Sequence, residues 1–142
     1  MDVIKFLNTH GIDALTNIKK VFIASKNVWI LNYEQVPLTK DGLGKYHPVL
    51  CQCRNLVVRE MSKNNWTVMS RSFRRFFFFI EDIVATEEFQ KRMVAGQVIA
   101  YEKFDGSLIT VVYFDNTWHI FTRGSNADSN PFRGTQFVGL AD

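Results

Sequence analysis

Short runs of β-branched and aromatic residues, separated by tight turns, recur along this chain and constrain its fold more than any other feature. Such runs are typical of strands, and turns built from Asn, Asp, Ser or Lys between them predict hairpins. The pairs are Val21–Tyr33 around Lys26-Asn27, Val49–Arg59 and Trp66–Arg71 around Ser62–Asn65, and Leu108–Phe114 and Thr117–Arg123 around Asp115-Asn116. Neighbouring strands joined in this way are antiparallel. A mostly antiparallel sheet is therefore expected.

Helical patterns are fewer and flank these strands. Residues 1–20 place apolar side chains at loosely helical spacing, and Glu81–Ala95 is the clearest helix. Its acidic residues come early, its basic residues occupy the last turn, and Gly96 follows as a C-cap. The pairs with helical i, i+4 spacing are Glu87/Lys91 and Glu88/Arg92. The expected fold class is α+β, with flanking helices on the sheet.

Between these elements the sequence predicts one loop, one more strand and an open tail. Glu34–Pro48 carries Pro and Gly and is expected to be a loop, whereas Gln97–Lys103 has the composition of a strand. The tail from residue 124 to 142 resembles a chain that stops early, since no closing strand or capped helix follows. No linker marks a boundary, so residues 1–142 are expected to form a single domain.

Composition excludes several classes of protein. The chain has 142 residues, of which 46% are hydrophobic and 22% charged, so a packed core is expected and disorder is not. No apolar run approaches the roughly 18 to 20 residues of a membrane-spanning helix, and the N-terminus lacks the pattern of a secretory signal. We therefore expect a protein of the cytoplasm, without a membrane partner.

The two cysteines fit a reducing compartment. Cys51 and Cys53 would share one face of a strand, but a structural zinc site needs about four ligands, and the three histidines are scattered. We assign no metal ligands and expect both thiols to be reduced.

The net charge of +3 is small, but its distribution is uneven. The segment from Arg54 to Arg75 contains six basic residues and one acidic residue. Clustered guanidinium groups suit phosphate, because each can donate two hydrogen bonds to one anion. A cluster of this size is more often a solvated surface, so charge alone decides nothing.

The segment Glu102–Leu108 carries the sharpest chemical pattern. Lys103 leaves an apolar stretch and meets a tight Asp105-Gly106 turn. Lysine becomes a nucleophile when it is desolvated or held near other positive charge, and glycine lets a ligand approach the backbone. An isolated Lys-x-Asp-Gly is more often a surface lysine before a turn, so this pattern needs support from the rest of the chain.

Four segments together supply that support. Lys103-x-Asp105-Gly106-Ser107 matches the nucleotidyl-lysine motif of ATP-dependent ligases and capping enzymes, and three further segments follow the order of one branch. They are Cys51–Val57, which resembles a Cys-Arg-Gly-aliphatic strand, Ser70–Phe77, which resembles Arg-Pro-x-x-Lys-Phe-Phe-Asn, and Phe121–Ser125, which resembles a Lys/Arg-Gly-Ser strand. The chain therefore resembles the RNA ligase 1 family of bacteriophages and its relatives over residues 30 to 130.

The resemblance implies a nucleotidyltransferase fold and a role for each matching residue. Lys103 matches the nucleophile that attacks the α-phosphate of ATP and becomes lysyl-AMP, with magnesium as the implied metal. Glu102 lies where the strand backbone and acidic side chains of family members approach the adenine. The motif residues Asp105 and Gly106 follow it. Arg54 matches the arginine that contacts the ribose and phosphate of the nucleotide, and Arg75 lies where the family has a lysine near the ATP phosphates. Arg123 matches a basic residue on the strand that lines the pocket. The implied activity is transfer of AMP to an RNA 5′-phosphate and strand sealing, as in tRNA repair.

Departures from the family pattern leave other functions open. Asn55 replaces a glycine, Phe78 an asparagine, and Arg75 a lysine. The family's later motifs would lie beyond Asp142, so the fold is expected to be truncated after the third motif. The alternatives are a truncated, non-catalytic relative that binds nucleotide, RNA or protein, and a half-enzyme completed by another chain. Either a homo-oligomer or a protein partner would then cover the apolar edge left by the missing half.

The aromatic residues have a simpler explanation than base stacking. The run Phe76–Phe79 is expected to pack in the core, because alternate residues of a strand face opposite sides. The three tryptophans, Trp29, Trp66 and Trp118, are assigned to the core or to sheet faces.

Overall fold

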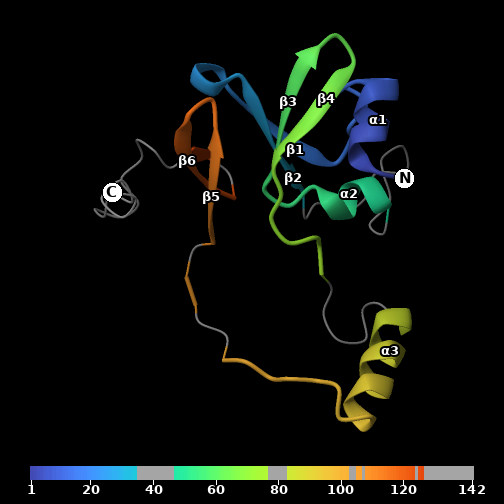
Figure 1. The fold of residues 1–142 in the computed structure, drawn as a ribbon. Coiled ribbons are helices and arrows are strands. Elements are labelled where there is room, and N and C mark those ends of the chain that lie inside the picture. The colour runs from blue at the N-terminus through green and yellow to red at the C-terminus, as the bar shows by residue number, and fades with distance from the viewer. Residues whose placement is uncertain (35–46, 77–82, 103–104, 107, 124, 127–142) are drawn as a thin grey trace. The chain divides into compact units, whose positions relative to one another are not determined.

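The computed structural model describes these residues: 1–34, 47–76, 83–102, 105–106, 108–123 and 125–126. The chain divides into two compact units, which are coloured along the chain in Figure 1. The first unit is Met1–Arg75 with Ser107–Asp142, and the second is Phe76–Gly106. Each unit is described below by itself.

The described residues of the first unit form two sheets and two α-helices. The four-stranded sheet has the order β1-β2-β3-β4 and the smaller sheet the order β5-β6-β7, and every pairing is antiparallel. The helices are α1 (Val3–His10) and α2 (Pro48–Gln52), with a 3₁₀ turn at Ala24–Lys26. The strands are β1 (Ile18–Ile23), β2 (Val28–Tyr33), β3 (Leu56–Ser62), β4 (Asn65–Ser70), β5 (Ile109–Phe114), β6 (Thr117–Thr122) and β7 (Ser125–Asn126).

Both faces of the four-stranded sheet are buried, so its central strands are apolar on both sides. Leu31 of β2 pairs with Leu56 of β3, and both pack in the core shared with α1 and α2. The next pair, Ile30 and Val57, packs on the opposite face in a core that includes Phe121 of β6. Figure 1 shows this order of layers, with α1 and α2 on one side of the sheet and β5 and β6 on the other. Alternation of side chains along each strand supplies both faces.

The expected α+β class with a mostly antiparallel sheet is confirmed, and the three hairpins form at the expected turns. Asn27, Asn64, Asp115 and Asn116 all have φ values between 49° and 60°. Asn and Asp tolerate this left-handed conformation better than other residues with a Cβ, so the turn residues explain where the hairpins reverse.

The strand expected at Val49–Arg59 is wrong in its first half. Residues Pro48–Gln52 form the short helix α2, and β3 begins only at Leu56. Pro48 suits the first turn of a helix, and the His47 ring accepts a hydrogen bond from the Val49 amide (3.3 Å) at its N-terminus. A short apolar run fits a buried helix as well as a strand, which is why its pattern misleads.

The strand expected at Gln97–Lys103 is also wrong over the part that the structure describes. Residues 97–102 have no regular structure, and Ile99 and Tyr101 are exposed. A strand needs a neighbour to pair its backbone groups, and none of the described strands pairs with this segment. Lys103 lies outside the described residues.

The expected helix of the second unit is present as α3 (Ile83–Val94). Gly96 has φ 69° and the amide of Gln97 donates to the Arg92 carbonyl (2.9 Å), which closes the helix as expected. The Arg92 side chain donates to Glu88 (2.7 Å), so this i, i+4 pair is confirmed. The pair Glu87/Lys91 stays a prediction.

The aromatic assignments hold only in part. Trp66 is buried, Trp29 packs against the core shared with α1 and α2, and Trp118 lies on the outer face of β6 at 58% exposed, so all three lie in the core or on a sheet face as assigned. Phe76 is 67% exposed and lies in no strand, so core packing is wrong for this residue. Residues 77–79 lie outside the described part of the chain.

Arg59 fastens the β5–β6 turn to the four-stranded sheet. Its guanidinium forms two hydrogen bonds with the Asp115 carboxylate (3.0 and 2.5 Å) and donates to the Lys26 carbonyl (2.8 Å). It also lies 5.0 Å above the centre of the Phe114 ring. This hydrogen bonding, together with the charge of Arg59, holds the pKa of Asp115 below its ordinary value.

The Arg59–Asp115 pair predicts how stability responds to acid. Because the folded-state pKa of Asp115 is lowered, its contribution is complete above the unfolded-state value of about 3.9 and is lost as pH falls through the folded-state value. We expect wild type to unfold at higher urea than Asp115→Asn near neutral pH, and this gap to close in acid. Asparagine suits the φ of 49° at this position, so the exchange removes the charge and one of the two acceptor oxygens without changing the turn. A gap independent of pH would contradict the assignment.

Candidate functional site

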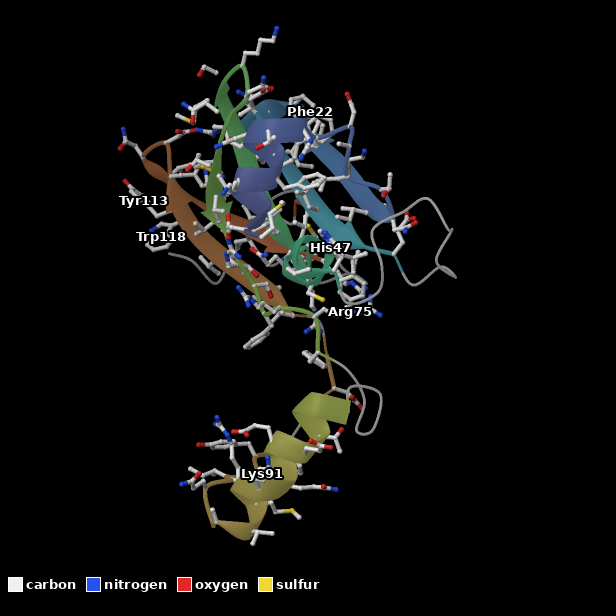
Figure 2. All side chains as sticks on the ribbon, turned by 90° about the vertical axis from the view of Figure 1, so that its right-hand side faces the viewer. Phe22, His47, Arg75, Lys91, Tyr113 and Trp118 are labelled. Carbon is white, nitrogen blue, oxygen red and sulfur yellow. The ribbon has the colours of Figure 1, made fainter. Side chains whose placement is uncertain are left out.

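The three candidate arginines lie in the first unit, each in the segment that follows an element of the fold. Arg54 follows α2, Arg75 follows β4 and Arg123 follows β6. Two backbone hydrogen bonds bring their segments together: the amide of Tyr33 donates to the Cys53 carbonyl, and the amide of Arg75 donates to the Cys51 carbonyl, both at 2.7 Å. Figure 2 labels Arg75 near α2, in agreement with its hydrogen bond to Cys51.

Tyr33, the last residue of β2, lies where two of these arginines meet. The guanidinium carbon of Arg75 lies 4.6 Å from the centre of the Tyr33 ring, and that of Arg123 lies 5.4 Å from it. Both distances are within the range of cation–π contacts. Two guanidinium groups from segments far apart in the sequence therefore contact one ring, and guanidinium groups are suited to binding anions.

A buried pair of asparagines sets the backbone of this site. The Asn32 side-chain amide donates to the Arg123 carbonyl, and its oxygen accepts from the Asn55 amide (2.8 Å). Asn55 in turn donates through its side chain to the Thr110 hydroxyl of β5 (3.1 Å). Both asparagines are buried, and buried polar side chains in proteins are normally hydrogen-bonded. They fix β5 and β6 against the start of β3.

The structure also explains why asparagine can replace glycine at position 55. Asn55 has φ 52°, in the left-handed region that glycine adopts freely and asparagine tolerates. The substitution therefore keeps the backbone course and adds a side chain that reaches β5. Arg54, directly before it, is half-buried, with its Nη1 atom shielded from solvent.

The remaining candidate residues belong to the second unit or lie outside the described part. Glu102, Asp105 and Gly106 are exposed. A Cβ added at Gly106 would meet no atom within 4 Å among the described residues. The nucleophile candidate, Lys103, is not among the residues described. The structure thus brings Arg75 and Arg123 together at Tyr33, next to the Arg54 segment, and leaves the motif around Lys103 as a prediction.

The sequence pattern did not point to Asn32 or Tyr33, which help to organise this cluster. Asn32 is a polar residue at an inward position of an apolar strand, which is a usable signal, because a buried polar side chain needs a reason. Tyr33 carries no such signal, since tyrosine at a strand end is common.

The two cysteines do not share a face, contrary to expectation. Cys51 lies within α2 and is half-buried, whereas Cys53 ends the helix, is fully buried and donates its thiol to the Val49 carbonyl (3.3 Å). Burial raises the pKa of the Cys53 thiol to about 12. Among the described residues no three His, Cys, Asp or Glu side chains are grouped as a metal site.

This difference predicts selective alkylation. The thiolate is the reactive form, so in the folded protein at mildly alkaline pH iodoacetamide is expected to modify Cys51 well before Cys53. Peptide mass spectrometry would locate the label, and addition of urea should make both thiols react. Equal labelling of the folded chain would contradict the burial of Cys53.

In the part of the chain that the structure describes, no helix has the length and apolarity needed to cross a membrane. No solved structure matches the chain.

Comparison with known sequences supplies the family. A family model described as RNA ligase matches residues 52–139, a stretch that contains every candidate residue named above. A protein of Autographa californica nuclear polyhedrosis virus, named as a bifunctional polynucleotide kinase/RNA ligase, is 33% identical over 132 residues. The match covers 88% of this chain but 18% of the viral protein, so the chain spans about a fifth of that relative's length. The chain belongs to the RNA ligase 1 family.

Proposed function

We propose that this chain carries out the nucleotidyl-transfer step of an ATP-dependent RNA ligase, with Lys103 as the nucleophile. The neutral amine of Lys103 attacks the α-phosphorus of ATP, a P–N bond forms, and the P–O bond to pyrophosphate breaks. The amine loses its proton to solvent. AMP then passes to an RNA 5′-phosphate, and a 3′-hydroxyl displaces it to seal the strand.

One observation carries this proposal: Arg75 and Arg123 converge at Tyr33, next to the backbone that leads into Arg54. Phosphoryl transfer needs cations around the phosphates, because charge develops on the oxygens of the transferred and leaving groups. In a member of the RNA ligase family, an arginine cluster of this kind supports binding of ATP phosphates.

The accompanying groups are part of the same proposal. Glu102, Asp105 and Gly106 are assigned to the nucleotide through the motif that surrounds Lys103. Magnesium rests on the resemblance alone: the described residues offer no ligand group for it, and no step is assigned to it. RNA ends such as those of cleaved tRNA are the proposed substrate, and the cytoplasm, which supplies ATP and RNA, is the proposed location. A nucleotidyltransferase fold, a homo-oligomer and a completing partner chain stay predictions.

Self-adenylylation tests the proposal directly. The purified chain, incubated with α-labelled ATP and magnesium, is expected to give a labelled band at 16.5 kDa on a denaturing gel. A lysyl phosphoramidate is labile in acid and stable in alkali, so this treatment distinguishes it from a phosphoester. No label at millimolar ATP would overturn the proposal. Binding of ATP without labelling would then favour the non-catalytic relative or the half-enzyme.

A further inference from the structure

We propose that Phe73 and Arg74 form a binding site for single-stranded RNA, in which the Phe73 ring stacks on a base and Arg74 contacts a phosphate. This inference deepens the proposed function and rests on it, because it locates where the chain holds its RNA rather than its nucleotide. In the pattern Arg-Pro-x-x-Lys that residues 71–75 resemble, both residues occupy the x positions, so that pattern assigns them no role.

Both side chains are presented to solvent by the segment that follows β4. Residues 71–76 have no regular structure, Phe73 is 66% exposed, and Arg74 is exposed as well. Phenylalanine is among the residues most often buried in folded proteins, although a single exposed ring needs no special explanation. The charged groups beside this ring therefore decide what kind of molecule it suits.

The segment is anchored at both ends. The Arg71 guanidinium donates to the side-chain oxygen of Gln52 (3.1 Å), and the Arg75 amide donates to the Cys51 carbonyl (2.7 Å). Both acceptors belong to α2, so this helix holds the two ends of residues 71–75. The proposed site lies between the anchors. Its backbone is thus fixed before a ligand arrives, which lowers the entropic cost of binding.

The charge around the site favours a nucleic acid. The sequence from residue 61 to 80 contains four basic residues and no acidic residue. Arg71 is partly neutralised, because its Nη2 atom lies 3.9 Å from the Asp2 carboxylate, whereas Arg74 is exposed. A phosphate attracts such a cation, and an exposed aromatic ring offers a face on which any base can stack.

Single-stranded RNA suits this site better than a duplex or a protein. The bases of a duplex are stacked on one another, whereas those of a single strand are open to side chains. A protein partner would favour a wider apolar patch, but the neighbours of the Phe73 ring in sequence are Ser72 and Arg74. The family model that matches the chain is described as RNA ligase, which makes RNA the expected nucleic acid.

Fluorescence anisotropy with a labelled single-stranded oligouridylate of about 12 nucleotides tests the role of the ring. We expect Phe73→Leu, which removes the ring and keeps an apolar side chain, to weaken binding about tenfold. Phe73→Tyr keeps the ring and should bind within about twofold of wild type. Phe22→Leu is the matched control, since Phe22 of β1 is another exposed ring of the same unit (Figure 2), and it should also bind like wild type.

The salt dependence of the same binding tests the charge. For single strands, each phosphate contact contributes about 0.7 to the slope of log Kd against log salt concentration. Arg74→Gln should lower this slope by about 0.7, whereas Phe73→Leu should leave it unchanged. Lys63→Gln removes the same charge from the exposed turn between β3 and β4 and should keep the wild-type slope.

Each contrary result identifies which idea fails. Equal RNA affinity in wild type and Phe73→Leu overturns this inference, as does an equal loss in Phe22→Leu or a wild-type chain that binds no RNA. Weaker binding of inorganic triphosphate in Phe73→Leu would also overturn it, because the ring would then serve the nucleotide. Self-adenylylation needs no RNA. Absence of that label, with RNA binding that depends on Phe73, overturns the proposed nucleotidyl transfer and leaves the RNA site in place.

Discussion

Replacement of Lys103 by arginine is expected to abolish covalent labelling of the chain by α-labelled ATP. Arginine keeps a positive charge in place, but its guanidinium does not lose a proton at usable pH and cannot act as the nucleophile. Loss of a nucleophile reduces rates by on the order of a thousandfold or more, so no band should be visible. Arg54, Arg75 and Arg123 are unchanged in this variant, and ATP binding should therefore persist.

Lys91 provides the matched control for this experiment. It is an exposed lysine in the last turn of α3, in the same unit of the chain as residue 102, and has no assigned role in the chemistry. Lys91→Arg should label like wild type. If Lys103→Arg still became labelled with an acid-labile adduct, another amine would be the nucleophile and the assignment of Lys103 would be wrong.

Replacement of Phe121 by alanine is expected to have the largest effect on folding stability. Phe121 is fully buried and lies in the core between the four-stranded sheet and the β5–β6 hairpin, with Val28, Ile30 and Val57. Removing a buried aromatic side chain costs about 3–5 kcal/mol in free energy of unfolding. Urea denaturation followed by circular dichroism would measure this loss.

Trp118 serves as the control on the same strand. It lies on the opposite face of β6 and packs against Tyr113 at 5.2 Å between ring centres, largely in solvent. Trp118→Ala should change the free energy of unfolding by less than about 1 kcal/mol. Equal losses in the two variants would mean that the hairpin does not pack on the sheet through Phe121.

Much of the fold follows from local chemistry that the sequence displays. The hairpins at Asn27, Asn64 and Asp115 were predicted because turn residues of the correct type interrupt β-branched runs. The Val49–Arg59 strand was predicted wrongly because its first half forms the buried helix α2. A short buried helix and a buried strand are equally apolar, so their sequences look alike. The strand predicted after Gly96 was wrong for another reason. A segment becomes a strand only when it pairs with a neighbouring strand, and composition does not show whether such a neighbour exists.

The candidate site divides in a similar way. Arg54, Arg75 and Arg123 came from a resemblance between short motifs, and the structure places two of them on one ring. Tyr33 and Asn32 escaped prediction because their importance depends on contacts with residues distant in the sequence. The periodicity of a sequence carries no information about such contacts. An asparagine within an apolar strand does indicate that its side chain has hydrogen-bond partners.

The Asn32 amide leaves a protein engineer very little freedom. Its nitrogen serves the Arg123 carbonyl while its oxygen serves the Asn55 amide, so the position requires a donor and an acceptor on a side chain of this length. Aspartate lacks the donor, leucine lacks both groups, and glutamine is one carbon too long for the same reach. A designer who treats β2 as a uniformly apolar strand could place an apolar residue at position 32 to improve packing. That change would remove the link between the Arg123 backbone, at the end of β6, and the Asn55 backbone, at the start of β3.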